Sequence, residues 1–350
     1  DAVVMGEGED TIIELLKELS NKSSLSDIRG IAFREGGKVV INERRPLIEN
    51  LDAIPFPAYE LFPINYYKLK RGANVSNADF TMDLLSGRGC TFKCNFCYRM
   101  DTGFRPRSNE GIIEEIKLLK QDYNISYIIF QDELLMSSVS RTVSLCEDFI
   151  KAKLDIKWNC QGRLNYAKPE VLDLMKKAGC VFINYGIEAM DDIVLKNMSK
   201  GLTTGQIIHG IENTLKAGIS PGFNIIFGHI GDNRETLDKA IDFLLKYDDA
   251  AQVRTIRPVT PYPGSPLYYF AIEQGFLKGV EDFYENRHIN SDLLTVNFTA
   301  MSDEEFHQCL FDANAKLLTN YFHKQLSNAL GKARKLYIEK DANFRGFRQT

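Results

Sequence analysis

From residue 80 onward, short apolar runs alternate with longer segments in which apolar residues recur every three or four positions. Segments such as 112–123, 139–150 and 172–178 have the spacing of amphipathic helices. Apolar strands joined by helical crossovers predict a parallel sheet covered on its outer side. Repeated strand-helix units favour an α/β fold, a partial (β/α)6 TIM-like barrel, over an open doubly wound sheet. The strand-length runs are 80–85, 125–130, 154–158, 180–187, 223–227 and 253–256.

The flanking segments follow other patterns. A strand-like AVVM, a tight turn at GEGED and a helical TIIELLKEL open the chain, and two alternating runs joined by EGG predict a hairpin. The Pro-rich IPFPAYELFP predicts a linker, and capping-box spacing beyond the sixth strand predicts a helical C-terminal extension. We divide the chain into an N-terminal α/β remnant at 1–25, hairpin and linker at 26–79, barrel at 80–275 and helical region at 276–350.

Composition restricts the class of protein. The 350 residues are 44% hydrophobic and 26% charged, with a formal net charge of -4, which is typical of a globular protein. Charges of both signs are interspersed, so no nucleic-acid partner is expected. No run approaches the roughly 18 apolar residues that a membrane span needs, and no leader opens the chain, so we expect a cytoplasmic protein without stable membrane insertion. Because the first residue is Asp1 and not Met, we expect a fragment or a processed chain.

Three of the seven cysteines, Cys90, Cys94 and Cys97, lie within GRGCTFKCNFCYR at 87–99. A disulfide uses two thiols and a closed zinc site uses four ligands, and neither His nor a second CxxC follows nearby. Three ligands on a 4Fe-4S cluster leave one iron open for another molecule. We therefore predict that these three cysteines bind a 4Fe-4S cluster, with a zinc or structural thiol group as the alternative. The other four cysteines lie in apolar patterns typical of the core, so they need no role as ligands: Cys146, Cys160, Cys180 and Cys309.

The motif CTFKCNFC after a predicted barrel strand resembles the CxxxCx(aromatic)C signature of the radical S-adenosylmethionine (SAM) superfamily, with Phe96 as the aromatic residue. Longer segments, including IIFQDELL, AGCVFINYGIEAM and PYPGSPLY, resemble the cobalamin-binding branch, which includes anaerobic ring cyclases and carbon methylases. The resemblance covers residues 1 to about 275. It implies that 1–25 are the tail of a Rossmann-like cobalamin-binding domain whose upstream part, with any DxHxxG segment, is absent from the sequence.

The resemblance also implies ligands for SAM at the ends of the predicted strands. Asp132 and Glu133 would receive its amino group, with a helix N-cap or a solvated loop as the alternative. Glu188 would bind the ribose hydroxyls and Arg163 the carboxylate, and an ion pair between these two residues is the alternative.

The stretch FNIIFGHIGDNRET partly matches a further family pattern, GxIxGxxE, and implies that Ile226 and Gly228 pack near adenine. We interpret Glu235, at capping-box spacing from Asp232, as a helix-capping residue. His229 follows a predicted strand end. It is interpreted as a solvated loop residue within possible reach of the substrate.

The predicted function is therefore a radical SAM enzyme in which a 4Fe-4S cluster cleaves SAM to a 5'-deoxyadenosyl radical. The resemblance favours cobalamin-assisted methyl transfer, or related C-H functionalisation, on a small-molecule, lipid-like or natural-product-like substrate. It implies an external electron donor such as flavodoxin or ferredoxin. Two alternatives remain, a cobalamin-independent radical SAM cyclase or rearrangement enzyme and an Fe-S electron-transfer protein. No residue is given a catalytic role.

Overall fold

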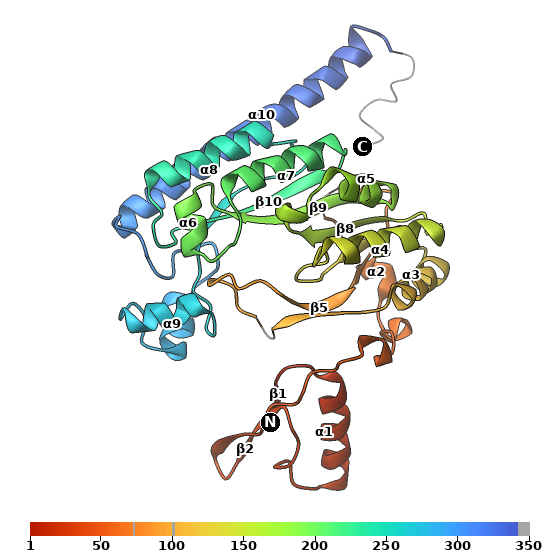
Figure 1. Cartoon of the computed structure of the whole chain (residues 1–350), viewed down its shortest axis with the longest axis vertical. Coiled ribbons are helices and arrows are strands. Elements are labelled where there is room, and N and C mark those ends of the chain that lie inside the picture. The colour runs from red at the N-terminus through yellow and green to blue at the C-terminus, as the bar shows by residue number, and fades with distance from the viewer. Residues whose placement is uncertain (73, 100–101, 342–350) are drawn as a thin grey trace.

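The computed structural model describes residues 1–72, 74–99 and 102–341, and its centre is one parallel sheet with helices on its outer side (Figure 1). Six strands follow in the order β11-β10-β9-β8-β7-β4, and each neighbouring pair is parallel. The predicted partial (β/α)6 barrel is therefore confirmed. Its strands are β4 (Thr81–Leu84), β7 (Tyr127–Phe130), β8 (Lys157–Gly162), β9 (Cys180–Glu188), β10 (Ser220–Phe227) and β11 (Ile256–Pro258).

The crossover helices begin where side chains satisfy their first backbone N–H groups. Ser108 and Ser138 each accept a hydrogen bond at a helix N-terminus, and Thr203 forms a capping box with Gln206. The apolar stripes of these helices pack against the sheet in one large core. The helices are α3 (Asn109–Tyr123), α4 (Val139–Lys151), α5 (Pro169–Lys177), α6 (Asp192–Asn197), α7 (Thr204–Lys216) and α8 (Arg234–Tyr247).

Strand β8 illustrates how the two faces of the sheet differ. Trp158 and Cys160 lie in the core beneath the helices and are at most 1% exposed. Gln161 points to the other face, because side chains alternate along a strand. There its Oε1 accepts a hydrogen bond of 2.9 Å from Asn184 Nδ2 of β9. The concave face therefore carries polar side chains at these positions of β8 and β9, whereas the helix-covered face of β8 carries core residues.

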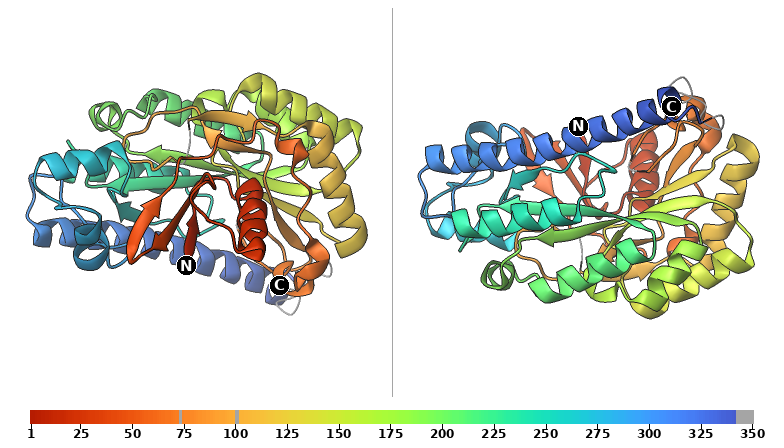
Figure 2. Two further views of the ribbon diagram at one scale, coloured as in Figure 1. Left: turned by 90° about the horizontal axis from the view of Figure 1, so that it is seen from below. Right: turned by 90° about the horizontal axis from the view of Figure 1, so that it is seen from above.

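The C-terminal helix α10 (Asp303–Tyr337) protects the open edge of the sheet at β11, and Figure 2 shows it running along that side of the molecule. Asn314 Oδ1 accepts from Ile256 N at 2.8 Å, while Asn314 Nδ2 donates to Ile256 O at 3.0 Å. One carboxamide thus satisfies both backbone groups that a further strand would have paired. Between β11 and α10, helix α9 (Pro266–Glu273) and its neighbours build a small core of their own.

The cysteine motif does not directly follow the first barrel strand, although the sequence placed it there. Strand β4 ends at Leu84, and Cys90 is the last residue of β5 (Gly87–Cys90). This strand pairs with β6 (Gly103–Pro106) in a separate antiparallel ribbon. The chain leaves the sheet at Ser86, whose N–H and hydroxyl both donate to the Asp132 carboxylate. The cysteine loop therefore extends from a ribbon rather than from the barrel wall.

Residues near the N-terminus form a separate small unit. Strand β1 (Ala2–Val4) pairs antiparallel with β2 (Ile31–Glu35), and β2 pairs antiparallel with β3 (Lys38–Ile41), so the predicted hairpin is confirmed. Helix α1 (Glu9–Asn21) covers this sheet. The unit has its own core, which consists of Leu15, Ile28, Ile31 and Phe33. The first strand therefore belongs with the hairpin in one small fold.

Glu7 joins this unit to the β5-β6 ribbon, which lies between the unit and the barrel (Figure 1). Arg88 and Arg105 lie directly opposite each other in the ribbon, and each donates to Glu7 Oε1 at 2.8 Å. Glu7 Oε2 accepts from Ile48 N at 2.7 Å. Burial alone would raise the pKa of Glu7, but hydrogen bonds from the two arginines lower it to about 2. The docking of the unit is therefore electrostatic and directional.

Within the described residues, no helix is both long and apolar enough to cross a membrane.

We predict that Glu7→Gln loosens the N-terminal unit from the ribbon at pH 7. Because the folded pKa of Glu7 is depressed from 4.5 to about 2, its stabilising contribution is complete above pH 4.5 and is lost as the pH falls toward 2. Hydrogen exchange of amides 1–41, referenced to barrel amides in the same sample, should rise in the variant and in acidified wild type. The control Glu35→Gln changes an exposed carboxylate of the hairpin. Unaltered exchange in Glu7→Gln would contradict this role of Glu7.

Candidate functional site

The three clustered cysteines lie in one loop that begins at the end of β5. The side chain of Cys94 is buried, whereas Cys90 and Cys97 are half-buried. The Cys97 thiol is hydrogen-bonded to Cys94, which lowers the pKa of Cys94 to about 6 and raises that of Cys97. In the described part of the chain, no three His, Cys, Asp or Glu side chains are gathered as ligands around a single metal ion. The loop thus presents three thiols without a disulfide, and those of Cys94 and Cys97 contact each other.

The other four cysteines are buried in the main core, as their positions in apolar patterns predicted. Burial raises the pKa of the Cys146 thiol well above its usual range. Such thiols favour the neutral form and behave as small apolar side chains. The other three buried cysteines are Cys160, Cys180 and Cys309.

Glu188 lies at the carboxyl end of β9 and forms a buried ion pair with Lys200. The distance between Glu188 Oε1 and Lys200 Nζ is 2.8 Å, and the two side chains are only 10% and 8% exposed. A bulge in the pairing with β10 places Glu188 at a φ of 70°, which turns its carboxylate back over the strand. A Cβ atom at Gly186 would lie 2.4 Å from Glu188 Oε1, so a larger residue there would displace the end of the Glu188 side chain.

Arg163 follows β8 and lies beneath the cysteine loop, at 5% exposure. Its Cζ atom is 3.5 Å from the centre of the Phe92 ring, and Nη2 donates to the carbonyl oxygens of Lys200 and Gly201. Burial lowers the pKa of Arg163, while its hydrogen bond to Cys94 acts in the opposite direction. The predicted alternative, an ion pair between Arg163 and Glu188, is wrong because Lys200 takes that place. Arg163 instead connects β8 to the cysteine loop.

Asp132 and Glu133, which follow β7, have different surroundings. Asp132 is 1% exposed, and burial raises its pKa to about 6 although hydrogen bonds from Ser86 oppose the change. Its carboxylate fixes the exit from β4. Glu133 is exposed and lines a cavity that Glu7 and Gln131 also line. Neither residue caps a helix here, because Ser138 caps the next one, α4.

The remaining predicted cofactor residues lie around the same end of the sheet. Phe96, in the cysteine loop, is half-buried and packs on the main core. Ile226 of β10 is also half-buried, and its neighbour Phe227 stacks on Phe306 of α10, with ring centres 5.1 Å apart. Gly228 has a φ of 98°, and a Cβ atom there would lie 2.6 Å from the Phe306 ring. The glycine is therefore required by packing.

The turn after β10 corrects two interpretations. His229 is not solvated: it is 0% exposed, and its Nε2 lies 3.0 Å from Asn95 Oδ1. The capping box of α8 is formed by Asn233 and Thr236, whereas Glu235 is exposed and pairs with Lys239. Sequence spacing missed the cap because several adjacent polar residues are suited to capping. It missed the burial of His229 because the contact with Asn95 joins residues far apart in the sequence.

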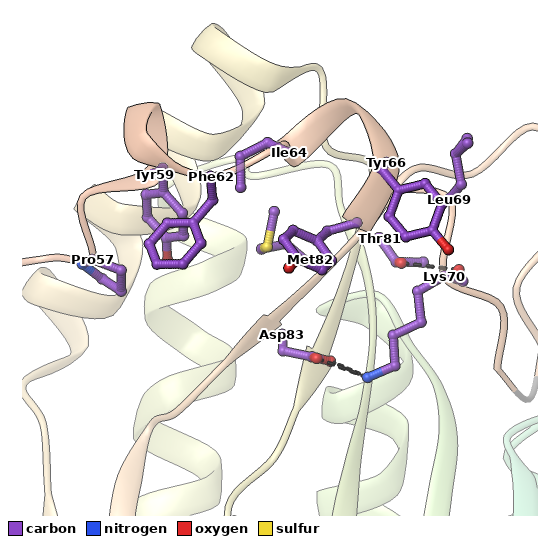
Figure 3. A pocket seen from close by; sticks show the side chains of 11 residues that line it. Pro57, Tyr59, Phe62, Ile64, Tyr66, Leu69, Lys70, Thr81, Met82 and Asp83 are labelled. Atoms are coloured by element: carbon purple, nitrogen blue, oxygen red, sulfur yellow. Dashed lines mark hydrogen bonds and ion pairs between the residues drawn. The ribbon is translucent and has the colours of Figure 1, made fainter.

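Three adjoining cavities lie next to the linker and β4. The first has a volume of about 580 Å³, and Figure 3 shows its aromatic wall of Tyr59, Phe62 and Tyr66 facing the Lys70–Asp83 ion pair. The second, about 410 Å³, shares Tyr59 and Asp83 with it. The third, about 370 Å³, shares Gln131 with the second and reaches the GEGED turn. A space with mixed apolar and polar walls therefore extends from the linker along β4 to the N-terminal unit.

Residues 84–244 match the Radical SAM superfamily. An uncharacterized methyltransferase from Pyrococcus horikoshii is 35% identical over 281 residues, which are 79% of this chain and 59% of the relative. An anaerobic magnesium-protoporphyrin IX monomethyl ester cyclase from Cereibacter sphaeroides is 27% identical over 278 residues, 77% of this chain and 44% of that protein. The chain therefore spans about half the length of these curated relatives.

Among solved structures, the cobalamin- and 4Fe-4S-bound radical SAM methyltransferase TsrM from Kitasatospora setae superposes with a TM-score of 0.69 at 17% identity, covering 90% of this chain and 68% of that one. The cobalamin-dependent radical SAM enzyme OxsB superposes with a TM-score of 0.59 at 21% identity, covering 79% and 40%. At these identities the likeness shows a shared fold.

We predict that Lys200→Met destabilises the fold by about 3 to 5 kcal/mol, because it leaves the Glu188 carboxylate buried without its partner. The double variant Glu188→Gln/Lys200→Met should recover part of this loss. The free energy of unfolding from urea titration measures both effects. Lys239→Met, which breaks a more exposed pair with Asp191, is the matched control and should change stability far less. Equal losses for the two lysine variants would contradict a special role for the buried pair.

Proposed function

Residues 84–244 of this chain are a radical SAM domain, and from this premise we propose that the protein is an enzyme that cleaves SAM at a 4Fe-4S cluster. The resulting 5'-deoxyadenosyl radical serves methyl transfer or related C-H functionalisation, assisted by cobalamin. The observation that carries the proposal is the loop with Cys90, Cys94 and Cys97, since the other four cysteines are buried in the core.

The residues present fit such a cluster. Three thiols from one loop match the donor set of a cubane that keeps one iron for a substrate, because each thiolate binds a different iron. Lys200 and Arg163 place positive charge near Cys94, which stabilises a thiolate there. The Nε atom of Arg163 is buried without a hydrogen-bond partner in the described part of the structure. One donor thus remains for an anionic group beside the loop.

Different side chains of the chain are suited to different groups of SAM. When bound, a reduced 4Fe-4S cluster supplies the electron that cleaves SAM into methionine and the 5'-deoxyadenosyl radical. Glu188, already oriented by Lys200, presents carboxylate oxygens suited to ribose hydroxyls. Arg163 Nε is suited to the SAM carboxylate. Asp132 and Glu133 remain our candidates for its amino group, and Ile226, Gly228 and Phe96 for the surface that contacts adenine.

We interpret the N-terminal unit as the tail of a Rossmann-like cobalamin-binding domain. The methyltransferase relative at 35% identity supports methyl transfer. The second candidate is a cobalamin-independent cyclisation or rearrangement, and the cyclase relative at 27% identity supports cyclisation. We further propose a small-molecule, lipid-like or natural-product-like substrate, flavodoxin or ferredoxin as electron donor, and a cytoplasmic location, where free thiols stay reduced.

We predict that Cys94→Ala abolishes cluster binding. Anaerobically reconstituted wild type should contain about four iron atoms per chain and, once reduced, convert SAM to 5'-deoxyadenosine and methionine. The variant should lose most of its iron and this cleavage. Cys309→Ala, which removes a core thiol, should retain both. Iron analysis and chromatography of the products measure the outcome, and cleavage of SAM by Cys94→Ala would contradict the proposal.

The fate of the SAM methyl group should distinguish the two candidate chemistries. With cobalamin and substrate bound to the full-length protein, methyl transfer should yield S-adenosylhomocysteine besides 5'-deoxyadenosine, because the methyl donor loses its methyl group. Cyclisation or rearrangement should yield 5'-deoxyadenosine and methionine without S-adenosylhomocysteine. Mass spectrometry with methyl-labelled SAM measures both products and locates the label. An unlabelled substrate product would rule out methyl transfer to it.

A further inference from the structure

Asn95 lies between Cys94 and Cys97 and uses all four of its polar groups in contacts with distant elements. Its backbone N–H donates to Met198 O at 3.0 Å, and its carbonyl accepts from Leu267 N at 2.8 Å. Its Nδ2 donates to Asn197 O at 2.7 Å, and its Oδ1 lies 3.0 Å from His229 Nε2. The contacts reach the end of α6, the start of α9 and the turn after β10, so one residue of the loop is fixed from three directions.

These contacts determine the tautomer of His229. Because Asn95 Nδ2 is already a donor to Asn197 O, the orientation of the carboxamide leaves Oδ1 as an acceptor. His229 Nε2 must therefore carry the proton and donate. The other ring nitrogen, Nδ1, is buried and has no partner in the described structure. The ring therefore donates one hydrogen bond, from Nε2 to Asn95 Oδ1.

His229 is itself held rigidly. Asp232 Oδ2 accepts from the backbone N–H groups of Gly228 and His229, each at 2.9 Å, and Asp232 Oδ1 accepts from Thr236 Oγ1 at 2.8 Å. Asn197 Nδ2 donates to Ile230 O at 2.9 Å in the same turn. Asn95 thus bonds to Asn197, Asn197 bonds to the turn that contains His229, and His229 bonds back to Asn95. These hydrogen bonds form a closed circuit.

We propose that Asn95 and His229 are positioning residues that hold the Cys94–Cys97 segment in its ligating shape before the cluster binds. The inference rests on the proposed function but concerns how the loop is prepared. A ligand loop held in advance loses less conformational freedom when it binds its group, and outer contacts of this kind orient the ligands. No other histidine in the described structure is 0% exposed. The circuit accounts for a buried polar ring next to the strand end.

The test compares three variants of His229 and Asn95 without and with the cluster. His229→Leu and Asn95→Ala remove the hydrogen bond, whereas His229→Gln supplies an N–H in place of Nε2 and should restore it. In the cluster-free chain, hydrogen exchange of amides 91–99 should become about five- to tenfold faster in the first two variants and stay near wild type in His229→Gln. His209→Leu, the same change at an exposed position of α7, is the control.

After reconstitution, His229→Leu and Asn95→Ala should show slower iron uptake and a broadened or shifted electron paramagnetic resonance signal of the reduced cluster, and His229→Gln should match wild type. Unchanged exchange and spectra in both disruptive variants would overturn the inference, as would a His229→Gln variant as disturbed as His229→Leu. If His229→Leu unfolds the barrel, the exchange rates and spectra of Asn95→Ala alone test the inference. Failure of wild type to bind iron or cleave SAM would instead refute the proposed function, because the exchange measurement needs neither.

Discussion

The parallel alignment of the six strands is the constraint on which the site depends. Parallel strands end on the same side of a sheet, so residues far apart in the sequence are brought to one edge. The register places Gly162 of β8 opposite Tyr185 of β9, and Glu188 opposite Ile225 of β10. Arg163 and Glu188 each follow or end one of these strands, and the cysteine loop packs above them. The sheet thus assembles the site, while the loop supplies the thiols.

Two buried carboxylates near the site are neutralised by cationic side chains. Lys200 neutralises Glu188 at the sheet edge, and two ribbon arginines neutralise Glu7 where the N-terminal unit docks. Burying an unpaired charge is costly, so each pair imposes a definite arrangement on the elements that carry it. The ribbon that binds Glu7 also carries the cysteine loop. The loop is therefore linked electrostatically, through Arg88 and Arg105, to the N-terminal unit.

The cysteine loop is also the place where local and long-range structure meet. Its thiols are close in sequence, but its backbone is held by Met198 and Leu267, which lie far along the chain. A two-stranded ribbon alone has little stability in water. Contacts with α6, α9 and the turn after β10 supply the missing constraint. The C-terminal half of the chain thus supports a motif near its beginning.

The sequence by itself determined the partial barrel, its strand-helix order and the three cysteines, because these depend on local periodicity and spacing. It also identified Glu188 and Arg163 as residues of one edge. Only the tertiary structure decided that Lys200 pairs with Glu188, that Cys90 ends a separate ribbon, and that His229 is buried against Asn95. The physical reason is range: a polar residue has many potential partners in sequence, and only packing of distant segments selects one and excludes water from it.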